Sequence, residues 1–212
     1  MEFREVIQNY AEEPITRQVI LDLLKDYKRP YDKINELVKQ GILIPVKRGI
    51  YIPGSKSNIA SPEPFLLANH LNGPSYISLE TALSYWGLIP EKVFEISSVT
   101  LKKTKLYNTK AGRFSYTNMP SPYYSLGIQR IALTNRQSVL ISKPEKALCD
   151  KIITISGLLL RSPKQTMEFL TEDLRIERQS LLNLKSGEIS KWIADAPKKE
   201  SLITLVKTLK KL

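Results

Sequence analysis

The stretch from Lys28 to Gly54 constrains the fold of this chain more than any other part. It reads KRPYDKINELVKQGILIPVKRGIYIPG. Its first half predicts an amphipathic helix that begins near Pro30 and ends at Gly41, because glycine readily adopts the left-handed conformation that follows a helix. Two short apolar runs then flank Lys47-Arg48-Gly49, which is typical of a β-hairpin. A helix followed by a basic-tipped hairpin is the outline of a winged helix.

Two more helices are expected before this stretch. Apolar residues recur at helical spacing over residues 3–10, and Thr16 is suited to cap a second helix that continues to Tyr27. In the helix that begins near Pro30, Ile34, Leu37 and Val38 face inward, which leaves the polar residues outside. Three helices and a hairpin in this order predict a winged helix-turn-helix domain over residues 1–56.

Residues 55–64 are polar and contain two prolines, which is typical of a linker, so we place a domain boundary there. Residues 57–212 are expected to form a second domain, mixed α/β to about 158 and helical from about 163. The predicted fold class is therefore α+β. Ser78 is expected to cap one helix, and the spacing of Ser142 and Glu145 predicts a capping box at the start of another. The expected strands cover residues 93–101, 112–117, 127–133 and 138–141.

The charge of the chain points to a polyanionic partner. It carries 32 basic and 21 acidic residues, a net charge of +11. Only +2 of this belongs to residues 1–56, which hold 10 basic and 8 acidic residues, so the basic surface is not confined to the first domain. The plainer alternative is a basic protein without a polyanion in its function. The single cysteine and the lack of a signal-peptide or membrane-length apolar run predict a cytoplasmic protein with no membrane partner.

Groups for catalysis are scarce. His70 is the only histidine, and Cys149 has no histidine near it in sequence, so both are interpreted as structural. No glycine-rich phosphate loop occurs. We therefore predict no enzyme activity, no cofactor and no metal. A metal-dependent nuclease that uses Glu145 or Asp150 stays as the less favoured alternative.

The nucleic-acid signal is stronger. The first turns of a recognition helix meet base edges, and basic residues in the turn and the wing contact phosphates. These positions give the candidate DNA-binding residues Lys28, Arg29, Tyr31, Lys33, Asn35, Lys47 and Arg48. The competing interpretation is a solvated charged face. A possible second basic patch consists of Lys102, Lys103, Lys105 and Arg113, for which the competing interpretation is a β-edge protected by lysines.

Several strings carry a resemblance to a known family. The hairpin string VKQGILIPVKRGIYIPG resembles the wing region of AbiEi-type antitoxins. Four later strings are similar in order and spacing to the antitoxin domain of that family: SYISLETALSYWGLIPE, SSVTLKKTK, GRFSYTNM and LISKPEKALCDKI. Together the resemblance covers roughly residues 28–155, and the four later strings make it specific.

The resemblance implies a non-enzymatic, DNA-binding antitoxin of a bacterial abortive-infection, type IV toxin–antitoxin pair. Such a protein binds inverted repeats in its own promoter as double-stranded DNA, represses its operon, and counteracts a nucleotidyltransferase-like toxin. In that family the C-terminal domain also contributes to repression. The alternative is a winged-helix transcriptional regulator whose C-terminal domain senses a ligand. The sequence leaves open the operator, the toxin's target, direct contact with the toxin, and the oligomeric state.

Overall fold

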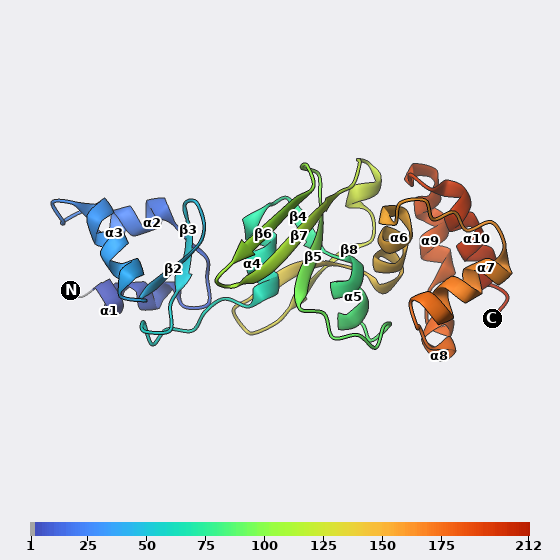
Figure 1. Ribbon diagram of the computed structural model, residues 1–212, viewed down its shortest axis with the longest axis horizontal. Coiled ribbons are helices and arrows are strands. Elements are labelled where there is room, and N and C mark those ends of the chain that lie inside the picture. Colours follow the sequence, from blue (N-terminus) through green and yellow to red (C-terminus); the bar gives the residue numbers. More distant parts are fainter. Residues whose placement is uncertain (1–2) are drawn as a thin grey trace.

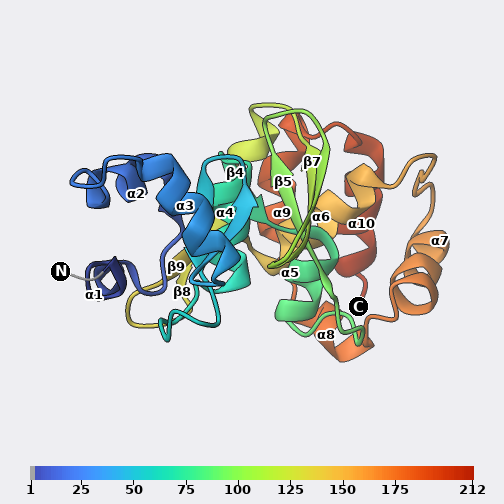
Figure 2. The same cartoon turned by 60° about the vertical axis from the view of Figure 1, so that its left-hand side comes forward.

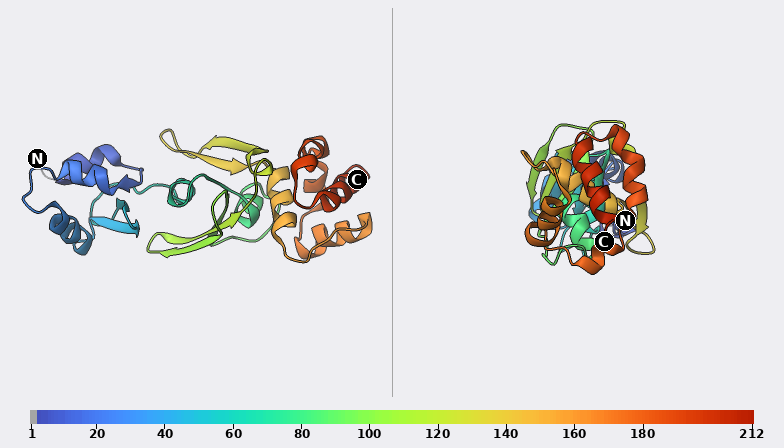
Figure 3. Two further views of the ribbon diagram at one scale, coloured as in Figure 1. Left: turned by 90° about the horizontal axis from the view of Figure 1, so that it is seen from above. Right: turned by 90° about the vertical axis from the view of Figure 1, so that its right-hand side faces the viewer.

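The computed structural model describes residues 3–212 and confirms the α+β class, with helices and two separate sheets. The molecule is elongated, and its parts follow one another along the long axis in chain order (Figure 1). Residues 3 to about 54 form an N-terminal unit, a six-stranded sheet lies in the middle, and the last helices lie at the far end (Figures 1 and 3).

The N-terminal unit consists of three α-helices and a small antiparallel sheet. The helices are α1 (Phe3–Ile7), α2 (Arg17–Leu23) and α3 (Pro30–Lys39), and a 3₁₀ turn covers Gln8–Tyr10. The strands pair in the order β1 (Ile15–Thr16), β3 (Ile50–Pro53), β2 (Leu43–Lys47). In the described part of this unit, buried apolar side chains form the core, including Ile7, Ile20 and Leu37.

The predicted ends of these helices are partly confirmed. Thr16 caps α2, because its Oγ1 accepts a hydrogen bond of 3.3 Å from the amide of Val19. Gly41 follows α3 with a φ of +72°, in the left-handed region. The prediction that α2 continues to Tyr27 is wrong, since the helix ends at Leu23. The residues after Leu24 are exposed, so no buried face supports another helical turn.

The central sheet has the order β6-β7-β5-β4-β9-β8. Its strands are β4 (Ser75–Ile77), β5 (Glu95–Thr100), β6 (Lys105–Thr109), β7 (Gly112–Asn118), β8 (Ile128–Ala132) and β9 (Ser138–Ser142). The β5–β7 and β4–β9 pairs are parallel and the others are antiparallel. The four predicted strands are present. The sequence did not predict β4, which has three residues, or β6, a largely exposed edge strand without an apolar pattern.

Three helices pack with the sheet: α4 (Pro64–Leu71), α5 (Leu79–Tyr85) and α6 (Pro144–Thr154). In Figure 1, α5 and α6 lie between the sheet and the C-terminal helices, and Figure 2 shows the same elements from a second side. The predicted capping box of α6 does not form. The Ser142 hydroxyl is buried and has no hydrogen-bond partner in the described part of the chain, while Glu145 accepts a 2.9 Å bond from the Lys185 amide. Ser78 occupies the N-cap of α5, but its hydroxyl donates to Asp150 instead.

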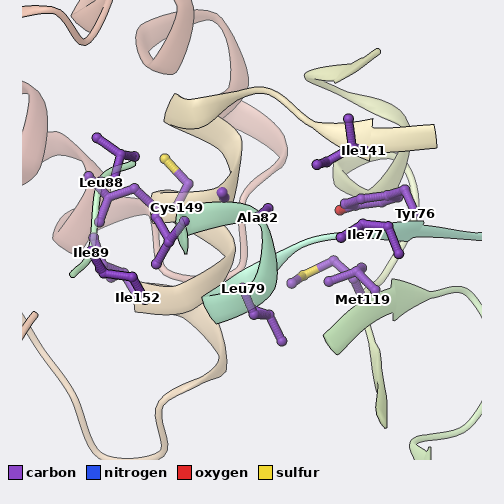
Figure 4. Close-up of a cluster of buried hydrophobic side chains, with 14 of the residues drawn as sticks. Tyr76, Ile77, Leu79, Ala82, Leu88, Ile89, Met119, Ile141, Cys149 and Ile152 are labelled. Carbon is purple, nitrogen blue, oxygen red and sulfur yellow. The ribbon is translucent and has the colours of Figure 1, made fainter. Parts of the chain in front are cut away.

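The C-terminal segment is helical from residue 163, as predicted. It comprises α7 (Pro163–Glu168), a π-helical turn (Phe169–Asp173), α8 (Arg178–Leu182), α9 (Ser186–Trp192), a 3₁₀ turn (Ile193–Asp195) and α10 (Lys199–Leu209). Their apolar faces join those of the sheet, α5 and α6 in one large core. Figure 4 shows the part of this core where Cys149 and Ile152 of α6 meet Ala82 of α5.

The β2–β3 hairpin contacts both cores. Leu43 belongs to the core of the N-terminal unit, whereas Val46 and Ile52 belong to the large core. Polar contacts add to this junction, because the Glu12 carboxylate accepts hydrogen bonds from Thr134 (3.3 Å) and Gln137 (3.1 Å) in the β8–β9 turn. The β6–β7 and β8–β9 hairpins both reach toward the N-terminal unit in the left view of Figure 3. The hairpin predicted as a DNA-contacting wing is therefore also the joint between the two parts.

Candidate nucleic-acid interface

Helix α3 presents the polar face that its sequence predicts. Ile34 and Leu37 are buried, while Tyr31 is 59% exposed and Asn35 is exposed. Lys33 is the exception on this face. Its ammonium lies 3.0 Å from the Glu36 carboxylate and above a neighbouring tyrosine ring. Tyr31 and Asn35 are thus accessible to a partner, whereas Lys33 already has partners within its own unit.

The turn before α3 carries two accessible basic residues. Lys28 is exposed, and the Arg29 side chain is 85% exposed, with its guanidinium 3.9 Å from the Asp32 carboxylate. An exposed pair at that distance contributes little, so the Arg29 guanidinium stays available. A shallow hollow of about 440 Å³ lies between this turn and the first turns of α3. The hollow joins the turn to Asp32, Lys33 and Glu36 of α3, and Tyr31 and Asn35 lie outside its lining.

The two basic residues at the hairpin tip have different surroundings. Arg48 lies in the β2–β3 turn and is exposed. The Lys47 ammonium instead donates a 2.8 Å hydrogen bond to the carbonyl of Leu71, at the end of α4, and lies 5.8 Å from the centre of the Tyr107 ring. Lys47 therefore holds the hairpin against the central sheet. Nothing in the local sequence distinguishes it from Arg48, because its partners lie 24 and 60 residues away.

The four residues of the predicted second patch do not share one surface. Lys102 and Lys103 are exposed between β5 and β6, and the Lys105 ammonium lies 4.8 Å from the centre of the Tyr107 ring. Lys105 and Tyr107 are on the same face of the sheet, because side chains alternate along a strand. Arg113 opposes Asn108 in the register and projects from the other face, where it forms an ion pair with Glu95. The patch therefore consists of Lys102, Lys103 and Lys105.

The structure joins this patch to the hairpin. The ammonium groups of Lys47 and Lys105 both lie close to the Tyr107 ring, at 5.8 and 4.8 Å from its centre. Basic residues of the N-terminal unit and of the central sheet are therefore neighbours. Sequence reasoning missed this continuity, because Tyr107 lies in the edge strand that was not predicted.

The carboxylates considered for a nuclease are already bonded to other protein groups. Asp150 is fully buried and faces Lys146, also fully buried, at 2.5 Å. Its other oxygen accepts from the hydroxyls of Tyr76 (2.9 Å) and Ser78 (2.7 Å). Burial and the adjacent Asp150 carboxylate raise the pKa of Tyr76 well above its ordinary value, so the phenol stays a hydrogen-bond donor. Over residues 3–212 no group of three or more His, Cys, Asp or Glu side chains is placed to hold a metal ion.

The remaining reactive side chains fit the structural interpretation. Cys149 is completely buried in the core shown in Figure 4, and burial, followed by the nearby Asp150 charge, raises the pKa of its thiol. His70 is exposed on α4. In the described chain, no helix has the length and apolar character needed to cross a bilayer.

Comparison with known proteins adds no identification: no family model and no curated protein matches this sequence.

Proposed function

We propose that this chain is a DNA-binding repressor whose N-terminal unit acts as a winged helix-turn-helix. The observation that carries the proposal is that Lys28 and Arg29 before α3, Tyr31 and Asn35 on α3, and Arg48 in the hairpin turn are all exposed on one unit. A polar helix face supplies groups that read base edges, and flanking basic residues supply phosphate contacts. The net charge of +11 supports a polyanionic partner.

The exposure of each side chain supports a division of roles within this proposal. Tyr31 and Asn35 read bases, because they are the accessible members of the α3 set, and Asn pairs with adenine. Six basic residues contact phosphates: Lys28, Arg29, Arg48, Lys102, Lys103 and Lys105. Lys33 and Lys47 support this surface through the contacts described above. Arg113 has no role in it, since it projects from the other face of the sheet.

The biological role that we propose is that of an antitoxin that represses its own toxin–antitoxin operon and counteracts a nucleotidyltransferase-like toxin. This part of the proposal rests on the resemblance of residues 28–155 to AbiEi-type antitoxins. The adjoining basic residues of the hairpin and the sheet support a contribution of both parts of the chain to repression. We propose that this antitoxin acts without catalysing a reaction. The carboxylates of Asp150 and Glu145 already bond to other groups of the protein, which supports this part of the proposal.

DNA binding is tested by fluorescence anisotropy with the labelled segment upstream of the chain's own gene and a scrambled segment of the same length. Six phosphate contacts predict that log K falls with log salt with a slope of about −5. Arg48→Gln is expected to make the slope less steep by about 1, and Asn35→Ala to reduce the preference for the upstream segment by about 1–3 kcal/mol. Lys199→Gln is the control, because Lys199 is exposed on α10 at the opposite end of the molecule (Figure 1).

Two results would contradict the proposal. Equal affinity for the upstream and scrambled segments would contradict the repressor function. Equal effects of Arg48→Gln and Lys199→Gln on binding would contradict the assigned DNA surface. The antitoxin role is tested separately by co-expression. The neighbouring reading frame is induced alone and together with this chain, and restored growth is the expected result. If the product of the neighbouring reading frame is toxic and this chain does not restore growth, the antitoxin role is wrong and only the role of a transcriptional regulator is left.

A further inference from the structure

The central sheet has an open groove on the face opposite Tyr107. Side chains alternate along β5 and β7, and the register pairs Ser97 with Ser115. Phe114 and Tyr116 point to the buried face, so Ser115 and Thr117 point to the other one, where they are only half-buried. This second face bears short hydroxyl side chains in place of an apolar layer. It lines a groove of about 610 Å³ bounded by α5 and α6.

The hydroxyls on the groove floor differ in how they are used. The Ser97 hydroxyl donates to the Ser78 carbonyl at 2.8 Å and accepts from the Thr81 amide at 3.2 Å, so it belongs to the scaffold. Within residues 3–212, no protein group hydrogen-bonds the hydroxyls of Ser115 and Thr117, which line the groove. These two side chains therefore supply donors and acceptors for a molecule in the groove.

Four charged side chains surround this floor, two of each sign. Lys151 of α6 forms an ion pair with Glu80 of α5, and Arg113 of β7 forms one with Glu95 of β5. Glu80, Glu95 and Lys151 line the groove, and Arg113 stands at its edge, next to Glu95 in the register. All four are partly exposed, so they can exchange partners without exposing a buried charge.

The balance of charge selects the class of ligand. A purely anionic molecule faces repulsion from Glu80 and Glu95, and a purely cationic one from Lys151 and Arg113. A zwitterion joins both pairs, with its ammonium on the carboxylates and its carboxylate on the basic groups, and charge-assisted hydrogen bonds of this kind are the strong ones. A volume of 610 Å³ lies within the range of small-molecule sites.

The backbone at the groove wall supports a binding role. Leu79 lines the groove with a φ of +55°, a conformation that is costly for a residue with a β-carbon. The neighbouring Ser78 is held on both sides, by its bond to Asp150 and by the bond from Ser97 to its carbonyl. Strained backbone conformations that neighbouring hydrogen bonds hold in place are often found at ligand-binding sites and in switch regions.

We infer that this groove binds a small zwitterion of the free amino acid class. Its ammonium lies between Glu80 and Glu95, its carboxylate engages Lys151 and Arg113, and Ser115 and Thr117 bond its polar atoms. This site is separate from the proposed DNA surface, because Arg113 and Thr117 project from the opposite face of the sheet to Lys105. Binding of an amino acid in this groove therefore does not depend on whether the protein binds DNA.

The test is a ¹H–¹⁵N NMR titration of the full chain with each free L-amino acid up to about 10 mM, which detects affinities in the millimolar range. At least one amino acid is expected to shift the amide signals of Ser97, Ser115 and Thr117 in a saturable manner. Its carboxamide, which lacks the negative charge, and its N-acetyl derivative, which lacks the positive charge, are each expected to bind at least about tenfold more weakly.

Variants assign the site. Arg113→Gln and Thr117→Val are expected to weaken binding at least about threefold, as loss of one hydrogen bond does. Both replace partly exposed side chains, so the melting temperature checks that the fold persists. Arg136→Gln, an exposed position in the β8–β9 turn, is the control and leaves the affinity unchanged. The inference is overturned if no amino acid shifts these amide signals, or if either derivative binds as tightly as the free amino acid.

Discussion

The buried pair Lys146–Asp150 offers the sharpest test of how the large core is held together. Neither side chain is exposed, and they lie 2.5 Å apart one helical turn from each other on α6. The Lys146 ammonium also donates to the Tyr76 hydroxyl at 2.7 Å and lies 3.9 Å from the centre of the Tyr123 ring. Lys146→Met keeps most of the apolar stem of the side chain and removes the terminal ammonium. The perturbation is therefore chiefly the loss of a buried charge and of its hydrogen bonds.

The expected cost follows from what Lys146→Met leaves behind. The Asp150 carboxylate keeps its bonds from Tyr76 and Ser78 but loses its only opposite charge within hydrogen-bonding distance in the described chain. Removing one partner of a buried ion pair costs about 3–5 kcal/mol, because the other charge stays buried without compensation. For a chain of this size, 1 kcal/mol lowers the melting temperature by about 2–4 °C. The variant is expected to melt roughly 6–20 °C below the parent protein.

A second substitution makes the prediction specific, because it is expected to restore part of the lost stability. Asp150→Asn removes the negative charge and keeps an acceptor for Ser78 and Tyr76, so Lys146→Met/Asp150→Asn is expected to be more stable than Lys146→Met alone. Urea unfolding followed by tryptophan fluorescence measures this, because Trp86 and Trp192 both pack in the large core.

The control is Lys151→Met on the same helix. Its ammonium pairs with Glu80 at the partly exposed surface, so its loss should cost no more than about 1 kcal/mol. The reasoning is contradicted if Lys146→Met lowers the free energy of unfolding no more than Lys151→Met does. It is also contradicted if the double variant is the least stable of the set, because the cost would then not come from an uncompensated buried charge.

Three further predictions concern local contacts, each measured as a change in the free energy of unfolding. Lys198→Met should cost about 2–3 kcal/mol, because its ammonium donates to three main-chain carbonyls around the end of α6, while Lys199→Met, on the exposed neighbour, should be near neutral. Thr16→Ala should cost about 1 kcal/mol through loss of the α2 cap. Gly54→Ala should cost at least about 2 kcal/mol, because its methyl group collides with a backbone carbonyl, whereas Gly187→Ala on α9 meets open space and should be neutral or stabilising. Equal costs within either matched pair, or no cost for Thr16→Ala, would contradict these assignments.

Much of the local structure could be predicted from residue patterns. The spacing of Ile34 and Leu37 predicts which face of α3 is buried, and Gly41 predicts where the helix ends. The four stronger strands and the helical character after residue 163 also follow from pattern. The capping box at Ser142 and Glu145 failed because Glu145 bonds elsewhere. Its carboxylate accepts a hydrogen bond from the Lys185 amide at the start of α9, a choice that depends on packing across 40 residues.

The candidate site shows the same division. Exposure of Tyr31, Asn35, Lys28 and Arg48 follows from their places on a helix face, a turn and a hairpin tip, all of which are local. The positions of Lys47 and Arg113 do not. Lys47 has its partners on α4 and β6. The pairing register of β6 and β7 puts Arg113 on the opposite face of the sheet from Lys105, and this register cannot be derived from the local sequence.

The class of the fold, the amphipathic helices, the basic charge and the resemblance on which the proposed role rests can all be derived from the amino-acid sequence. These are properties of neighbouring residues and of composition, and they need no knowledge of distant contacts. Three features are visible only in the folded chain: the hairpin serves as a joint between two cores, Tyr107 links two groups of lysines, and one sheet face forms an open groove. Each of these depends on strand order and register, which bring together residues separated by tens of positions, and long-range pairing is what local periodicity does not encode.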